Sequence, residues 1–485
     1  MTQASNRRRL LEAALAVTVS AFAAPGMPRV GGARAASSKL EGLPRLDGTL
    51  LLDDATCDAM SDDWAHVIRR RPAAVLRPKS AQDVLRIVRY ANERSLRVSV
   101  RGLAHSSHGQ TLAEGAILVD CSVLNAAAVD QRGRLDAQPG AIVAQLATTA
   151  LGKNLIPPVL PDCRMLTLGG MLSAGLLGNT SQHHGALVDN VLELDVVTGD
   201  GRLVRCSAER DKELFEMVLG GMGQCGIVVR TRLRLVPART HAVLQDLTYR
   251  HLDAYLADQA RVATEGRFDH QYGAAIRERD GSWKFVMQLG RFFNHPWQPD
   301  LEVLQKDLRF DARAEPAVMN ALDYVYRSPP RPAQIRDPAV DPASNVTMWI
   351  PASATKALVT PFLELPVESA GLRGFSFWPL NAARFTRPLF KVPVSEPVFF
   401  SMWLNRRAPR GDAQALEALQ AGTRDLLAKL AAAGGKRYSP YSPVPSASEA
   451  VEHYGAETLQ RFARAKAKFD PNSVLASEAV QFTPV

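Results

Sequence analysis

Leu96-Arg97-Val98-Ser99-Val100 runs directly into Arg101-Gly102-Leu103-Ala104-His105-Ser106-Ser107-His108-Gly109-Gln110, and these residues are the most informative about the architecture. The first five residues alternate apolar and polar side chains, which predicts a β-strand. The next ten form a turn rich in glycine, alanine and serine. Such a turn lets the main chain approach a pyrophosphate closely, where larger side chains would clash.

A second turn of the same kind lies at Thr167-Leu168-Gly169-Gly170-Met171-Leu172-Ser173-Ala174-Gly175. By contrast, Gly221-Met222-Gly223-Gln224-Cys225-Gly226 matches GxGxxG, but a helical pattern precedes it and a strand pattern follows it. A dinucleotide fingerprint needs the opposite order, a strand before the glycines and a helix after them. We therefore interpret residues 221–226 as a tight helix-to-strand turn whose backbone could also lie beside a cofactor.

Short strand and helix patterns alternate on both sides of these turns, between residues 71 and 237. The expected strands are 74–76, 116–120, 191–197, 202–205 and 227–236, and the expected helices are 84–93 and 211–219. From about residue 240 to 435, aromatic residues and prolines become more frequent, which indicates a second domain. A last helix, residues 456–468, should end before Asp470-Pro471 because proline cannot continue it. The sequence predicts an α+β protein with two lobes.

The first 35 residues have the pattern of a targeting segment. Arg7, Arg8 and Arg9 precede an apolar run, residues 10–24, and Ala33-Arg34-Ala35 supplies a small-x-small cleavage site. We interpret residues 1–35 as a twin-arginine-like signal peptide, which predicts a periplasmic or secreted protein. The alternative is a short anchor that is not cleaved. No later run reaches the roughly eighteen apolar residues of a membrane span, so we expect none.

Composition excludes several classes of function. The formal net charge of +9 falls partly in the first 35 residues, and the remaining excess is too small to predict a nucleic-acid partner. The five cysteines are widely spaced and include no CxxC pair. The histidine pairs 105/108 and 183/184 lack a carboxylate or cysteine at the usual spacing, so we predict no metal site.

The turn at residues 101–110 resembles the Arg-Gly-x-Gly-His-Ser-x-x-Gly-Gln signature of the cytokinin dehydrogenases. These enzymes are members of the vanillyl-alcohol oxidase/p-cresol methylhydroxylase (PCMH) flavoprotein superfamily. The resemblance extends over roughly residues 70 to 485. Its further segments are 161–162, 166–173, 189–199, 213–215, 219–224, 378–381, 436–440, 453–455 and 468–471.

This resemblance implies an architecture and a cofactor. Residues 55–237 would form a PCMH-type FAD-binding domain, and residues 238–435 a substrate domain whose antiparallel sheet, flanked by helices, roofs the flavin. Residues 436–485 would return to the FAD-binding domain. The residues that we expect at the FAD, besides those discussed below, are Arg101, Gly102, Ser106, Gln110, Thr167, Gly169, Gly170, Ser173, Ile227 and Tyr438.

The resemblance also implies that the flavin is covalently bound. The family attaches the 8α carbon of FAD to the histidine that corresponds to His105, although the glycine before it is replaced by Ala104. Cys163 stands six residues before Gly169. Berberine-bridge-type oxidases of the superfamily carry a second flavin link from a cysteine at that spacing. The alternative for Cys163 is a buried, inert thiol.

Two residues are expected to act on the substrate. The family's catalytic aspartate corresponds to Asp162, which would also lie at the FAD and would accept a proton as a hydride leaves for flavin N5. The alternative is a turn aspartate after Pro161. Tyr272 takes the place of the family's second acidic substrate residue, and residues 343–347 replace its His-Pro-Trp-Leu-Asn segment.

The reaction implied by the resemblance is oxidation of a C–N bond in a small molecule. An N6-substituted adenine or a related amine would become an imine, and oxygen or a quinone would accept the electrons. The alternatives are a phenolic, alcohol or sugar-like substrate, or a flavin carrier without turnover. The presence of Asp162 argues against the carrier.

Overall fold

The computed structural model describes residues 40–328, 340–365 and 374–476. The predicted signal peptide, residues 1–35, lies outside this part of the chain. Residues 42–485 form one compact unit, and every element described below belongs to it. Within the described residues, no helix combines the length and apolarity that a membrane crossing requires.

The turn at residues 101–110 follows a strand of a small, mostly parallel sheet. Its strand order is β1-β2-β4-β3, where β2 and β3 each pair in parallel with β4 and β1 pairs antiparallel with β2. The strands are β1 (Thr49–Leu51), β2 (Ala74–Arg77), β4 (Ile117–Asp120) and β3 (Val98–Arg101). Helix α4 (Ala81–Glu93) makes the crossover from β2 to β3 and buries an apolar stripe that includes Val84, Ile87 and Val88. The strands and the helix predicted in this region are confirmed.

The chain's last described residues return to β3. The Val98 backbone N–H donates to Val474 O over 2.7 Å, and the Ala476 N–H donates to Val98 O over 2.8 Å. The buried carboxylate of Asp470, just after α15 (Ala456–Phe469), accepts hydrogen bonds from the backbone N–H groups of Val474 (2.8 Å) and Leu475 (3.0 Å). Asp470 therefore fixes the path by which the C-terminal segment reaches the strand before the turn.

A five-stranded antiparallel sheet follows in the chain. Its order is β5-β6-β10-β8-β9, formed by β5 (Ala127–Val129), β6 (Leu135–Ala137), β10 (Ile227–Leu233), β8 (Val191–Val197) and β9 (Leu203–Ser207). The predicted hairpin of β8 and β9 is confirmed. The single strand expected over residues 227–236 is wrong. β10 ends at Leu233, and β11 (Val236–Pro237) pairs instead with β7 (Leu155–Ile156).

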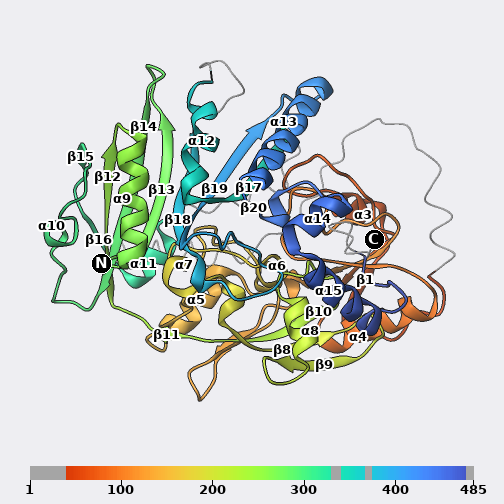
Figure 1. Ribbon diagram of the computed structural model, residues 1–485. Coiled ribbons are helices and arrows are strands. Elements are labelled where there is room, and N and C mark those ends of the chain that lie inside the picture. The colour runs from red at the N-terminus through yellow and green to blue at the C-terminus, as the bar shows by residue number, and fades with distance from the viewer. Residues whose placement is uncertain (1–39, 329–339, 366–373, 477–485) are drawn as a thin grey trace. The chain divides into compact units, whose positions relative to one another are not determined.

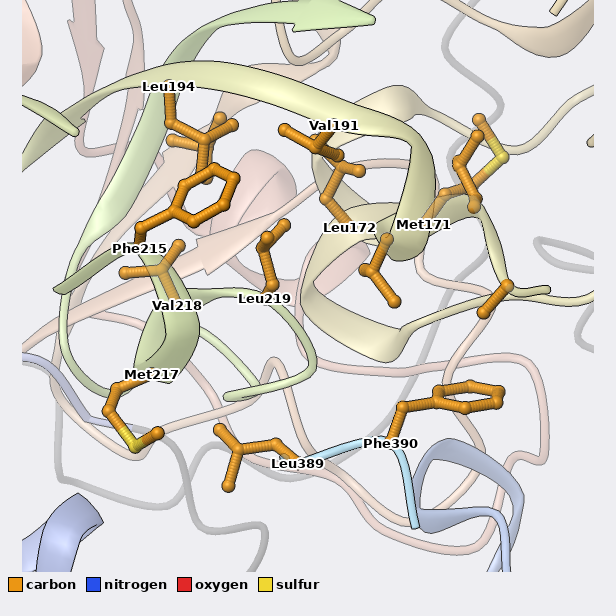
Figure 2. Close-up of a cluster of buried hydrophobic side chains, with 14 of the residues drawn as sticks. Met171, Leu172, Val191, Leu194, Phe215, Met217, Val218, Leu219, Leu389 and Phe390 are labelled. Atoms are coloured by element: carbon orange, nitrogen blue, oxygen red, sulfur yellow. The ribbon is translucent and has the colours of Figure 1, made fainter. Parts of the chain in front are cut away.

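The second small-residue turn is anchored by the core beneath this sheet. Figure 2 shows Leu172 of α6 (Leu168–Ala174) beside Val191 of β8, and Phe215 and Val218 of α8 (Lys212–Val218) near Leu194 of the same strand. These side chains are buried members of one hydrophobic cluster. Burying a side chain of this size contributes roughly 1.5–3 kcal/mol. The cluster therefore holds α6, and the turn that opens it, in a fixed position.

Residues after 240 build a nine-stranded sheet. Its order is β15-β12-β14-β13-β18-β19-β17-β20, with β16 paired to β12. The strands are β12 (His241–Tyr249), β13 (His270–Arg277), β14 (Trp283–Phe293), β15 (Ala312–Arg313), β16 (Ala317–Asn320), β17 (Ala343–Pro351), β18 (Gly374–Asn381), β19 (Val398–Arg407) and β20 (Lys436–Arg437). The sheet is antiparallel throughout.

The two faces of this sheet have different neighbours. Helices α9 (Leu252–Glu265), α12 (Ala352–Leu363) and α13 (Ala413–Ala432) pack on one face, where a second hydrophobic cluster lies (Figure 1). From the other face, Trp349, Leu380 and Phe399 join the first cluster, together with α6 and α8. The predicted α+β fold with an antiparallel sheet flanked by helices is confirmed, whereas the limits 55–237, 238–435 and 436–485 stay predictions.

The remaining described α-helices lie between these strands or follow the last of them. They are α3 (Asp54–Ala59), α5 (Val143–Leu151), α7 (Ser181–His184), α10 (Leu301–Leu304), α11 (Ala321–Tyr326) and α14 (Ala447–Tyr454).

Replacing Asp470 by alanine should loosen the C-terminal segment. Two buried backbone N–H groups would lose their acceptor, so we expect the free energy of unfolding to fall by roughly 2–4 kcal/mol. Differential scanning fluorimetry checks this as a lower melting temperature, and limited proteolysis should cut near residue 470. Asp425→Ala is the matched control, because Asp425 forms an i,i+4 pair with Lys429 as Asp470 does with Lys466, but on the surface. Equal melting of both variants would contradict the anchoring role.

Candidate active site

The two small-residue turns meet at one cavity. An empty volume of ≈1160 Å³ lies between the loop after β3, the start of α6, the start of β10 and the C-terminal segment. The predicted FAD residues that line it are Arg101, Gly102, His105, Ser106, Gln110, Thr167, Gly169, Gly170, Ser173, Ile227 and Tyr438. The cavity is also lined by Met222, Gly223 and Gly226. They belong to the glycine-rich segment 221–226, which lies between α8 and β10 and is therefore the predicted helix-to-strand turn.

Glycines allow the walls of this cavity to approach each other. A Cβ added to Gly102 would lie 2.0 Å from Thr167 Oγ1, and one added to Gly169 would lie 2.8 Å from Pro139 Cβ. Both distances are far below normal van der Waals contact. The backbone of Gly102 therefore touches the side chain of Thr167, which joins the turns of residues 101–110 and 167–175, and Gly169 packs closely against Pro139.

Arg101 and Gln110 hold the first turn in place. The buried guanidinium of Arg101 donates to the carbonyl oxygens of Met60 (2.9 Å) and Asp62 (3.1 Å). The Gln110 amide donates to the carbonyl oxygens of Ser439 and Pro440, both over 3.2 Å. These bonds tie the turn to the preceding and to the C-terminal segments, so both side chains have a structural role in addition to lining the cavity.

His105 lies among three side chains from distant parts of the chain. Its Nδ1 is 2.6 Å from the hydroxyl of Tyr441, and its Nε2 is 3.7 Å from Cys163 Sγ. Its ring stacks on Trp64 with 6.0 Å between ring centroids. Burial raises the pKa of Tyr441 well above its ordinary value, so the phenol stays neutral and can share a proton with the imidazole. An imidazole that lines the cavity and a thiol just outside its lining, both potential nucleophiles, are thus brought together.

Ala104, directly before His105, takes the conformation that normally requires glycine. Its φ is +56°, in the left-handed region. The residue is buried in a cluster with Trp64, Ala65 and Ala343. Its methyl group therefore packs into this cluster in spite of the backbone strain.

Asp162 lies outside the residues that line the 1160 Å³ cavity, as do Cys163 and Tyr272. The Asp162 carboxylate pairs with the guanidinium of Arg327, and the Asn179 amide donates to both of its oxygens over 3.1 Å. Its side chain is 38% exposed, so it remains accessible. Because a cation and an amide face it, the side chain is held in a fixed orientation.

Tyr272 lies on β13 and faces a separate hollow. Its ring is 5.3 Å from that of Trp378, and the hollow is also lined by Ser376, Trp403 and Asn405. Tyr272 therefore belongs to the nine-stranded sheet, apart from the turns that form the cavity.

Two buried hydroxyls of the cavity wall have no hydrogen-bond partner among the described residues. They are Ser106 Oγ and Thr111 Oγ1. Buried polar groups are nearly always paired in native proteins, so a polar ligand in this cavity would satisfy both. Among all residues that the structure describes, no group of three or more histidine, cysteine or acidic side chains is arranged to hold a metal ion.

The sequence did not reveal several neighbours of the predicted residues. Only the fold brings Trp64 and Tyr441 to His105. In the same way it brings Asn179 and Arg327 to Asp162. Tyr441 follows the predicted Tyr438 by three residues in a segment expected to return to the FAD domain, which was a usable signal. Arg327 and Asn179 stand in no recognisable pattern.

Comparisons with known proteins agree with this geometry. Residues 72–207 match the FAD binding domain family. An uncharacterized oxidoreductase of the fasciation locus of Rhodococcoides fascians is 29% identical over 435 residues, 89% of this chain and 98% of the relative. Cytokinin dehydrogenase 1 of Oryza sativa subsp. japonica is 28% identical and is aligned over 96% of this chain and 98% of its own length.

A solved structure supports the fold. The crystal structure of 6-hydroxy-D-nicotine oxidase from Arthrobacter nicotinovorans superposes with a TM-score of 0.67 at 22% identity, covering 90% of this chain and 98% of that one. The chain is therefore an FAD-dependent oxidoreductase with a PCMH-type FAD binding domain, and the cytokinin dehydrogenases are among its homologues.

Proposed function

We propose that this enzyme oxidises the C–N bond of an N6-substituted adenine or a related amine, with FAD held in the 1160 Å³ cavity and attached to His105. The observation that carries the proposal is the placement of His105 at this cavity, fixed by Tyr441 and beside Cys163. The unpaired hydroxyls of Ser106 and Thr111 suit the polar part of a dinucleotide. When bound, FAD supplies a two-electron acceptor at N5.

Asp162 is the proposed proton acceptor. As a hydride leaves the substrate carbon, the substrate N–H must lose a proton, and a carboxylate within reach can take it. Arg327 and Asn179 would orient this carboxylate, so that its free lone pairs face the substrate. The imine that results would be hydrolysed by water, and oxygen or a quinone would accept the two electrons and two protons.

The covalent attachment would join an imidazole nitrogen of His105 to the flavin 8α carbon. The new C–N bond replaces an imidazole N–H and one C–H of the flavin methyl group, which is a two-electron oxidation with oxygen or a quinone as acceptor. Because Cys163 Sγ lies 3.7 Å from His105 Nε2, a second, thioether link from this thiol to the same flavin is also proposed. We further propose that residues 1–35 export the protein.

Intact-mass spectrometry after denaturation tests the attachment. The wild-type chain should be heavier by one FAD, with the adduct on the peptide that contains His105. His105→Asn should abolish the adduct if it is the sole link, whereas a second link at Cys163 would keep the adduct until Cys163→Ser is added. Release of all flavin from the wild-type chain by acid would contradict covalent attachment.

Asp162→Asn should slow reduction of the flavin by about 10²- to 10⁴-fold, because the amide cannot accept the substrate proton. Anaerobic stopped-flow absorbance with an N6-substituted adenine measures this rate, and the FAD content should stay that of the wild type. Asp269→Asn is the matched control, since Asp269 pairs with Arg291 over 3.1 Å as Asp162 pairs with Arg327. An unchanged rate in Asp162→Asn would remove this residue from the mechanism.

Gly102→Ala should lower the FAD content of the purified protein several-fold. The added methyl would collide with Thr167 and force the two turns apart, at a cost of about 1–3 kcal/mol. The ratio of flavin to protein absorbance reports the loading. Gly152→Ala is the control, because the nearest atom to its added Cβ is 3.5 Å away. Equal loading of both variants would show that the contact of the two turns does not shape the FAD site.

A further inference from the structure

The central strands of the nine-stranded sheet separate apolar from polar side chains. On β17 and β19, the side chains of Val346, Met348, Met402 and Leu404 belong to the cluster beneath the helices. Successive side chains of a strand point to opposite faces. The alternate residues of these strands, Asn345 among them, therefore face away from the helices.

Residues directly opposite each other in an antiparallel ladder share a face. Asn345 lies opposite Asn405, Ser376 lies opposite Trp403, and Trp378 lies opposite Ser401. We call Asn345, Asn405, Ser401, Trp403 and Trp378 the amide wall.

Hydrogen-bonding groups of the amide wall are buried but unpaired. Within the described residues, no partner is present for Asn345 Nδ2 and Oδ1, Asn405 Oδ1, Ser401 Oγ, or the indole Nε1 of Trp378 and Trp403. Asn345 is only 1% exposed. Six such atoms on one face are far from the normal state of buried polar groups. A ligand with complementary groups would relieve this deficit.

The amide wall adjoins the turn that carries His105. The Ala343 N–H donates to Ala65 O over 2.9 Å, and the side chain of Trp403 packs on the cluster that contains Ala104. His108 is hydrogen-bonded to the backbone of Asn345. The predicted substrate residue Tyr272 reaches the same face, with its ring 5.3 Å from Trp378. A molecule on this wall would therefore lie next to the proposed flavin.

We propose that Asn345 and Asn405 determine specificity by hydrogen-bonding the edge of a planar nitrogen heterocycle, against which Trp403 and Trp378 pack. This inference rests on the proposed function. A side-chain amide presents a donor and an acceptor side by side, which matches a ring edge that carries both, such as the amino and ring nitrogens of adenine. The indoles supply flat apolar surface for the ring.

Binding of two probes to the oxidised holoenzyme tests the proposal. Adenine carries a donor–acceptor edge, whereas indole is a planar bicycle with one donor and no ring-nitrogen acceptor. We expect Asn345→Leu to weaken adenine binding at least tenfold in isothermal titration calorimetry, and to change indole binding less than threefold. Asn405→Leu should act in the same direction. Asn125→Leu, the same substitution at an exposed loop position, should change neither.

Melting temperature separates a binding role from a structural one. Asn345→Leu removes two unpaired buried polar atoms, so the variant should melt no lower than the wild type in the absence of probe. If Asn345 supported the fold through hydrogen bonds, the variant would melt lower, and Asn405→Leu would then carry the binding test. Adenine affinity within threefold of the wild type in both variants, or no adenine binding to the wild type, would overturn the proposal.

Anaerobic flavin reduction distinguishes this inference from the proposed function. If an N6-substituted adenine reduces the wild type and Asn345→Leu with the same KM, the proposed binding role of the amide wall is wrong, and the proposed function is unaffected. If adenine binding depends on Asn345 but no amine reduces the flavin, the binding role of the amide wall is supported and the proposed function is contradicted.

Discussion

The contact between Gly102 and Thr167 is the constraint on which the site depends. It joins a turn that leaves the parallel sheet to a turn that opens α6, and it leaves no room for even one additional carbon atom. Each turn is held from behind by different means: the first by hydrogen bonds of Arg101 and Gln110, the second by the hydrophobic cluster around Leu172. Because both turns are rigid, the cavity between them has a defined shape before any ligand enters.

The nine-stranded sheet contributes a second kind of surface. The turns present backbone and small side chains, which suit a large cofactor that must be approached closely. The sheet presents indoles and amides next to the turn that carries His105. Such groups suit a smaller molecule that must be recognised by its edges. On the proposed function, the cofactor would lie against the turns and the substrate against the strands.

Sequence patterns predict the parts of this site where the backbone imposes the residue type. The glycines of both turns, and the strand before the first, are visible because few alternatives satisfy a close approach of main chains. Side-chain pairings leave no such trace. Arg327 meets Asp162 from 165 positions further along the chain, and Tyr441 meets His105 from 336 positions away. Asn345 is equally inconspicuous in the sequence, because its burial depends on which strands pair with β17.

The return of the C-terminal segment to β3 has a consequence for biosynthesis. Ala476 lines the cavity and its N–H donates to Val98 O, so the chain must be synthesised beyond residue 476 before the wall of the cavity can close. A cofactor held by this wall would then be inserted after that point of synthesis. If residues 1–35 act as the proposed export signal, a chain loaded with FAD before export would leave the cell already folded. The twin-arginine pathway, which transports folded proteins, is compatible with that order of events.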